Sequence, residues 1–416
     1  MNGALPARAG YQAWLTALLS LNFGLVLFDR NALNFLMPFV QPELGLSNTQ
    51  VGMLSGGLSL TWAVAALLIG AAADRWGSRK RLLVACTLVF ALCSFASGVA
   101  GGFIAMLGTR LVMGAAEGGI MPLSQALIAA QVAPHRRGLA MGIAQGLGSS
   151  LMGSFVAPVV LVGFATALGW RPAFFLAGAP ALLSALLMAA SIRDVPAAAA
   201  PVPARSDAAA GDRPRGAWHA VLADGNVRRC AVLSIVFVAY LVVTWAFMPL
   251  YLVRTRGYDA GTMSWLMGTL GIAATLFSFL VTGLSDRIGR RPVMRVVPLL
   301  ALILPLAALF YPGSPWGLAA LFFVGWTFTG IMPLFMATVP AESVAPRLVG
   351  TAMGLCMGGS EIIGGVLAPL ASGYAADRYG LRAPIWVLLA LAVLGSVASL
   401  GLRETAPRRA PGIGGT

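Results

Sequence analysis

GAAADRWGSRKR at residues 70–81 returns, in altered form, as TGLSDRIGRRPV at residues 282–293. The two stretches lie 212 residues apart (282 against 70), and both contain D-R-x-G-x-R. Shorter matches follow in the same order at nearly the same spacing: GLAMG at 138–142 with GTAMG at 350–354, and GIMPL at 119–123 with 330–334. Ordered matches at one spacing predict that the chain consists of two homologous halves.

The composition is that of a membrane protein. Of 416 residues, 58% are hydrophobic and only 10% are charged, and the mean hydropathy is +0.84. A soluble domain averages about 45–50% apolar and about 25% charged residues, which excludes a soluble globular protein, a disordered chain and a coiled coil. Each membrane-spanning helix needs about 20 apolar residues. We predict twelve spans, at 13–38, 48–72, 82–100, 103–128, 139–165, 171–192, 228–252, 262–284, 293–311, 316–339, 349–376 and 383–402.

The predicted fold is an all-α integral membrane protein whose twelve transmembrane helices form two pseudo-symmetric six-helix bundles. Residues 1–192 form the first half and residues 227–416 the second. Residues 193–226, rich in Ala, Pro and Arg, form a cytoplasmic linker between them. Parallel halves with a substrate site near mid-membrane, at their interface, are typical of transporters.

The positive charge is concentrated in the predicted loops. Most of the 28 lysine and arginine residues fall on the cytoplasmic side when both termini are placed there, as the positive-inside rule requires. This placement accounts for the formal net charge of +14. It predicts contact with anionic membrane lipids and argues against binding of nucleic acid.

Five charged residues lie inside predicted spans and break the internal repeat. They are Asp29, Arg30, Arg110, Glu117 and Glu361. Their counterparts at offsets of 211 and 212 are uncharged: Tyr240, Leu241, Leu321, Phe328 and Ser149. A charge at a helix centre costs about 2.5–3.5 kcal/mol on insertion scales. Because the fold accepts uncharged residues at the equivalent places, we interpret the five charges as functional.

Four of these charges are expected at similar depth in the membrane. Asp29 and Arg30 are about two-thirds of the way along the first span, and Arg110 and Glu117 lie in the fourth span, which runs back. Arg110 and Glu117 are two helical turns apart and share a face, whereas adjacent residues diverge by about 100°. One of Asp29 and Arg30 can therefore face a central cavity while the other meets the fourth span.

The two D-R-x-G-x-R loops, with the twelve spans and the long linker, resemble the major facilitator superfamily over the whole chain. The resemblance implies a latch that closes the cytoplasmic side and breaks in each transport cycle. We expect its residues to be Gly70, Asp74, Arg75, Gly77 and Arg79 in the first half and Asp286, Arg287 and Arg291 in the second. The alternative is that these charges serve only the positive-inside topology.

F-D-R-N-A-L-N at 28–34 and R-L-V-M-G-A-A-E-G at 110–118 resemble the anion:cation symporter branch of that superfamily. The resemblance implies that Arg30 holds a substrate carboxylate. It implies that Asp29 and Glu117 carry protons and that Arg110 is their charge partner. A purely structural buried ion pair between Asp29 and Arg110 is the alternative. Arginine keeps its proton, so a carboxylate is its natural ligand.

Further polar residues are candidates for the substrate site. Asn34, Gln145, Tyr240 and Ser360 either line the cavity or hydrogen-bond neighbouring helices. Glu361, in G-G-S-E-I-I-G-G, departs from the family pattern. It is a third proton site, a ligand for a polar or cationic substrate group, or an interhelical anchor.

The sequence therefore predicts a multi-pass protein of the bacterial inner membrane, expected as a monomer, that takes up a small organic anion with protons by alternating access. A proton-coupled drug or metabolite exporter is the alternative. Exporters of the superfamily usually carry a Gly-Pro followed by paired glycines in the fifth span, whereas S-F-V-A-P-V-V-L-V-G stands at 154–163. No enzymatic motif, metal cluster or cofactor motif is found in the sequence, so we expect no enzyme activity, no metal and no cofactor.

Overall fold

The computed structural model describes residues 9–73, 78–144, 151–194 and 217–406, and helices account for nearly all of this part. Eleven helices of the described residues are long and apolar enough to cross a membrane. The predicted second span corresponds to α2 (Asn48–Ala73), a helix of 26 residues that is not among the eleven. The fold is thus all-helical with eleven candidate spans, while the count of twelve and the cytoplasmic termini remain predictions.

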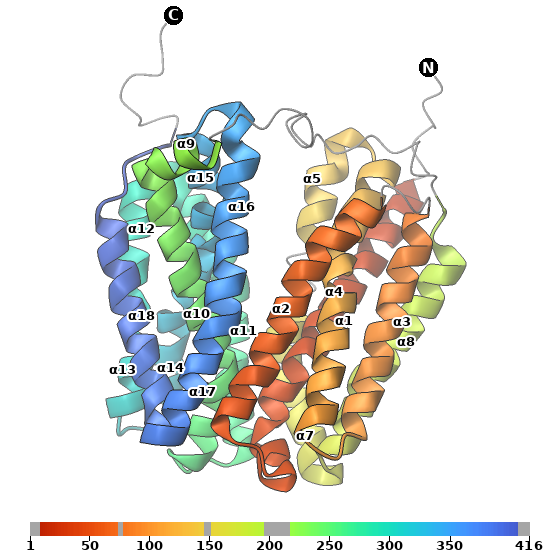
Figure 1. The fold of residues 1–416 in the computed structure, drawn as a ribbon, viewed down its shortest axis with the longest axis vertical. Coiled ribbons are helices and arrows are strands. Elements are labelled where there is room, and N and C mark those ends of the chain that lie inside the picture. Colours follow the sequence, from red (N-terminus) through yellow and green to blue (C-terminus); the bar gives the residue numbers. More distant parts are fainter. Residues whose placement is uncertain (1–8, 74–77, 145–150, 195–216, 407–416) are drawn as a thin grey trace, which may run out of the picture. The chain divides into compact units, whose positions relative to one another are not determined.

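The chain divides into two compact units. Unit 1 comprises Met1–Leu46, Gly57–Ala204 and Tyr258–Gly271, and unit 2 comprises Ser47–Gly56, Arg205–Gly257 and Ile272–Thr416. The predicted boundaries at 192 and 227 remain a prediction. The helices of both units are labelled in Figure 1, and α2 and α11 are divided between the units.

Unit 1 is built around α1 and α3. Its described helices are α1 (Ala9–Leu44), most of α2, α3 (Arg79–Gly98), α4 (Phe103–Gln131), α5 (Pro134–Gly142), the π-helical η2 (Leu151–Val156), α7 (Ala157–Leu168), α8 (Trp170–Ser191) and the start of α11 (Ala260–Ile288). Helix α3 packs against α4 and α8, and α1 packs against α8 and η2. Leu19, Phe90 and Ile120 are among the fully buried side chains of this core.

Unit 2 is built around α10. Its described helices are the start of α2, α9 (Ala217–Ala223), α10 (Gly225–Arg254), the rest of α11, α12 (Arg290–Leu300), α13 (Ile303–Phe310), α14 (Pro315–Gly325), η4 (Trp326–Ile331), η5 (Leu334–Thr338), α15 (Val339–Ser343), η6 (Pro346–Leu348), α16 (Val349–Gly359), η7 (Ser360–Leu367), α17 (Ala368–Tyr379) and α18 (Arg382–Leu400). Helix α10 packs against α18 and η7. Stacked rings of Phe237, Phe328 and Phe335 fill the core beside it.

Two π-helical segments, η2 and η7, occur at equivalent places of the repeat. A proline follows each of them. Pro158 follows η2 and Pro369 follows η7, 211 residues later (369 against 158). Proline lacks the N–H that would bond to the carbonyl four residues before it. That carbonyl belongs to Ser154 in η2 and to Gly365 in η7. A wider π turn accommodates the carbonyl group that receives no hydrogen bond from the proline. Such turns are frequent at functional sites.

Candidate functional site

Asp29 and Arg30 of α1 and Arg110 and Glu117 of α4 differ sharply in exposure. Asp29 and Glu117 are 0% exposed and Arg110 is 1% exposed. The side chain of Arg30 is 21% exposed. Arg30 is thus the member of this cluster that can reach a solute without a rearrangement of the core.

Asp29 is held by α3 and not by a direct ion pair. Its Oδ1 accepts a hydrogen bond from Ser94 Oγ at 2.7 Å, and its Oδ2 has no hydrogen-bond donor among the described residues. Arg110 attracts Asp29 electrostatically. Its Nη2 donates to Ser97 Oγ at 2.8 Å, and its guanidinium lies 5.6 Å from the ring centre of Phe174. Ser94 and Ser97, one turn apart on α3, thus form hydrogen bonds with the Asp29 carboxyl group and the Arg110 guanidinium, respectively.

Arg30 faces Glu117 and α2. Its Nη1 lies 4.0 Å from Glu117 Oε2, at the limit of an ion pair. Its Nη2 donates a long hydrogen bond of 3.4 Å to Ser59 Oγ, and its guanidinium lies 5.3 Å from the ring centre of Trp62. Among the described residues, the hydrogen bond to Ser59 engages one of its five N–H donors. A planar fork of that kind fits a carboxylate or a sulfonate.

Glycines of α4 bring α2 close enough to make these contacts. A Cβ at Gly114 would stand 2.3 Å from the Leu58 carbonyl oxygen, and one at Gly118 would stand 2.4 Å from the Trp62 carbonyl oxygen. No larger residue fits without separating the helices. The small residues of R-L-V-M-G-A-A-E-G therefore place Ser59 and Trp62 beside Arg30.

The remaining candidates for the substrate site are placed as follows. Asn34 is half-buried and bonds to Asn31, which anchors α1 to the Gly153 carbonyl of η2. In unit 2, Ser360 at the start of η7 is buried and donates to the Met357 carbonyl at the end of α16. Glu361 is half-buried at the start of η7. Gln145 lies outside the described residues.

Tyr240 is a core residue of unit 2. It is fully buried, and its hydroxyl donates to the Ala301 carbonyl at 2.8 Å. Ala301 lies in the short segment between α12 and α13. Its ring packs on Phe328 and Trp326. These contacts lie inside the core of unit 2.

The predicted latch loop of the first half is described only at its edges. Asp74, Arg75 and Gly77 lie outside the described residues, and Gly70 is part of α2. Arg79 begins α3 and is 4% exposed.

The loop of the second half is a compact charge network. Asp286 and Arg287 end α11, Gly289 turns the chain with φ +103°, and α12 begins at Arg290. Arg290 pairs with Asp286 and, at 3.2 Å, with Glu342 Oε1. Arginine thereby ties the end of α11 to α15.

Glu404 caps α12 in this network. Its Oε1 accepts the Arg290 N–H at 2.8 Å and its Oε2 accepts the Arg291 N–H at 3.1 Å. Partial burial raises the pKa of this carboxyl, but the backbone N–H donors of Ala406, Arg290, Arg291 and Thr405 outweigh it, and the net pKa is lowered. A carboxylate at a helix start is further favoured by the helix dipole.

The family model described as Major Facilitator Superfamily matches residues 19–355 and 230–415. The chain belongs to the major facilitator superfamily. A solved bacterial homologue of the human lysosomal transporter Spinster, inward-facing and occupied, superposes with a TM-score of 0.76 at 20% identity, over 94% of this chain and 96% of that one. That likeness concerns the fold alone.

Relatives within the superfamily are named for different transport functions. A probable sulfoacetate transporter of Cupriavidus necator is 26% identical over 402 residues, 93% of this chain and 92% of the relative. A hexuronate transporter of Bacillus subtilis is 28% identical over 254 residues, 59% of each chain. An efflux pump of Mycolicibacterium smegmatis is 28% identical over 325 residues, 74% of this chain and 70% of the relative. The protein is a multi-pass protein of the bacterial inner membrane.

The sequence reasoning missed residues that complete this superfamily member's charged sites. Ser94 and Ser97 gave no signal, because serine is common in membrane helices and their partners come from other helices. Glu404 did have a signal. It follows the last span of the second half, as Asp194 follows that of the first, and Asp194 accepts from Ser78 Oγ at 2.8 Å at the start of α3. Comparing the ends of the two halves would have found both acids.

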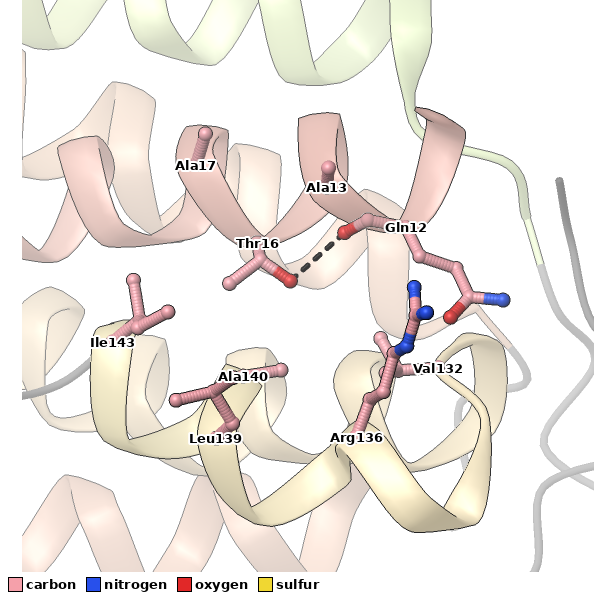
Figure 2. Close-up of a pocket in the computed structure, with 9 residues that line it drawn as sticks. All are labelled: Gln12, Ala13, Thr16, Ala17, Val132, Arg136, Leu139, Ala140 and Ile143. Carbon is pink, nitrogen blue, oxygen red and sulfur yellow. Dashed lines mark hydrogen bonds between the residues drawn. The ribbon is translucent and has the colours of Figure 1, made fainter. Parts of the chain in front are cut away.

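A cavity of about 320 Å³ in unit 1 lies apart from the charged cluster (Figure 2). Gln12 and Arg136 line one end of it, and Leu139 and Ile143 line the other. Thr16 lies between them and donates to the Gln12 carbonyl at 2.8 Å. Asp29, Arg30, Arg110 and Glu117 do not line this cavity.

Proposed function

We propose that this superfamily member takes up a small organic anion together with protons. The observation that carries the proposal is the arrangement in unit 1, where one partly exposed arginine stands beside a fully buried carboxyl group. Arg30 binds the anionic group of the substrate, and Asp29 and Glu117 carry the protons, with Arg110 as their charge partner. The resemblance of the surrounding motifs to anion:cation symporters supports these roles.

The substrate class follows from the chemistry of Arg30. A guanidinium keeps its charge and offers paired N–H donors to two oxygens of one group. Two relatives are named as transporters of sulfoacetate and of hexuronate, and both of these substrates carry a carboxylate. Trp62 beside the guanidinium adds an apolar wall. A small carboxylate with further polar groups is the substrate that this set favours.

Charge balance supports coupling to protons. If all four groups are ionised, Asp29 and Glu117 balance Arg30 and Arg110. A bound monovalent anion would then leave an unbalanced negative charge in a region of low dielectric, where uncompensated charge is costly. Protonation of one acid restores the balance. We infer that anion and proton bind together and leave together.

Conformational control belongs to the two D-R-x-G-x-R loops in this proposal. Asp286, Arg290 and Glu342 form a network that can break and re-form as helices move. We propose that these contacts and their counterparts in the first half set the rate of alternating access, with both termini in the cytoplasm. Glu361 adds a proton site, a ligand for a polar or cationic substrate group, or an interhelical anchor.

Export is the competing function, because a relative named as an efflux pump and another named as a multidrug resistance protein also match most of the chain. A ligand-induced thermal-shift screen of the purified protein separates the two. Binding raises the melting temperature as ligand exceeds its dissociation constant. We expect small carboxylates or sulfonates to stabilise the wild type but not Arg30→Ala. Stabilisation by cationic drugs alone, retained in Arg30→Ala, would favour the exporter.

A further inference from the structure

Ser94 stands where three helices of unit 1 meet. Its Oγ, on α3, lies 2.7 Å from Asp29 Oδ1 on α1 and 2.9 Å from the Phe174 carbonyl oxygen on α8. All three residues are 0% exposed. Both distances are those of good hydrogen bonds.

A hydroxyl carries one proton and two lone pairs, so Ser94 cannot donate to both oxygens at once. When Asp29 is ionised, it can only accept, and the Ser94 proton points to it. When Asp29 is protonated, its own O–H can donate to Ser94 Oγ, and the Ser94 proton then points to the Phe174 carbonyl. Both protonation states of Asp29 are therefore fully hydrogen-bonded at this oxygen.

The titratable and charged groups near Asp29 come from α1, α3 and α4. Arg110 attracts its ionised form, and Glu117, Arg30 and the thiol of Cys93 belong to the same electrostatic cluster. Helix α8 contributes the Phe174 carbonyl, whose residue also lays its ring beside Arg110. Ser94 is the group that donates a hydrogen bond to the carboxyl.

Close packing of α8 on α3 makes the second partner available. A Cβ at Gly178, one turn after Phe174, would stand 3.0 Å from the Ala91 carbonyl oxygen and 3.1 Å from Ser94 Cβ. Glycine at this place lets the Phe174 carbonyl come within reach of the hydroxyl.

We propose that Ser94 is a positioning residue for the coupling proton: its single hydroxyl proton turns from the Asp29 carboxylate to the Phe174 carbonyl when Asp29 is protonated. The inference rests on the proposed role of Asp29 as a proton carrier. It adds a residue on α3 that sets how readily Asp29 releases its proton, and a hydrogen bond between α3 and α8 that strengthens when Asp29 is protonated.

The test is an infrared pH titration of the full-length protein in detergent with no substrate added. The carboxyl band that disappears in Asp29→Asn reports Asp29. A hydrogen bond to a charged group is roughly twice as strong as a neutral one, so Ser94→Ala removes more from the ionised form. We expect its titration midpoint to move to higher pH by about one unit. Ser94→Cys, which keeps a weak donor, should give a smaller shift in the same direction.

Ser184→Ala is the matched control. Ser184 is also buried and also bridges to α1, through Asn22 at 3.1 Å, away from the acids. Its Asp29 midpoint should equal that of the wild type. An unmoved midpoint in Ser94→Ala, or a shift to lower pH, would overturn the role of Ser94. An Asp29 band that does not titrate at all in the wild type would instead contradict the proposed proton carrier.

Discussion

At the scale of single residues, exposure separates two arginines to which the family resemblance assigns different roles. Arg30 and Arg110 both break the internal repeat and both lie in spans, so both were functional candidates. The structure gives Arg110 a serine and a ring within the core, whereas Arg30 keeps an exposed edge. Burial depends on how neighbouring helices pack, which a single sequence does not specify.

Arg30→Lys should weaken anion binding at least about tenfold, although it keeps the charge. Lysine loses the planar fork that pairs with two oxygens, and tenfold corresponds to about 1.4 kcal/mol. Arg30→Ala should abolish detectable binding. Equilibrium binding of the anion selected by the thermal-shift screen measures both, with Arg136→Lys, an exposed arginine of the same unit, as control. Near-normal affinity of Arg30→Ala for the anion would show that Arg30 does not bind the substrate.

At the scale of helices, α3 and α8 approach closely at two glycines, Gly98 of α3 and Gly178 of α8. Gly178→Ala gains helix propensity, but its Cβ would stand 3.0 Å from the Ala91 carbonyl oxygen. Overpacking of this kind costs about 1–3 kcal/mol. We expect a lower melting temperature in detergent. Gly163→Ala in α7, whose Cβ would meet nothing within 4 Å, should not lower it. Equal melting temperatures for the two variants would show that α8 can move away freely.

Glu404→Gln should destabilise unit 2 in a pH-dependent way. The carboxylate caps α12, and loss of a cap costs about 1 kcal/mol near neutral pH. Because its folded pKa is lowered, this stabilisation is complete above the ordinary glutamate pKa of about 4.3 and is lost as the pH falls through the lowered value. The melting difference from the wild type should therefore shrink on acidification.

The control for Glu404→Gln is Asp224→Asn. Asp224 caps α10 by accepting from Asn226 N and Val227 N, both at 2.9 Å. Asparagine is an equally good cap, so we expect little loss at neutral pH. A melting difference for Glu404→Gln that stays constant from neutral to acid pH would mean that its charge does not hold the cap.

At the scale of the whole molecule, the repeat and the hydropathy predicted the superfamily. Periodic apolar stretches and the D-R-x-G-x-R loops are properties of the sequence itself, so they could be read without a structure. The segmentation of the spans could not. Of the predicted span at 139–165, the described residues belong to α5, the π-helical η2 and α7, while residues 145–150 lie outside the described part. Hydropathy alone does not predict the π turn before Pro158, which lacks a backbone donor. The hydroxyl groups that receive the buried charges could not be predicted either, because three helices must pack before Ser94 meets Asp29.

We propose that Glu117 couples anion uptake to protons. It is fully buried and lies 4.0 Å from Arg30. Glu117→Gln mimics the protonated carboxyl permanently, so the variant should still bind the anion and exchange it across the membrane. It should not concentrate the anion when an inward proton gradient is imposed. The measurement pairs counterflow with proton-driven uptake in proteoliposomes, using the anion selected by the thermal-shift screen. Exchange without accumulation is the predicted result, and accumulation by Glu117→Gln in response to the pH gradient would contradict it.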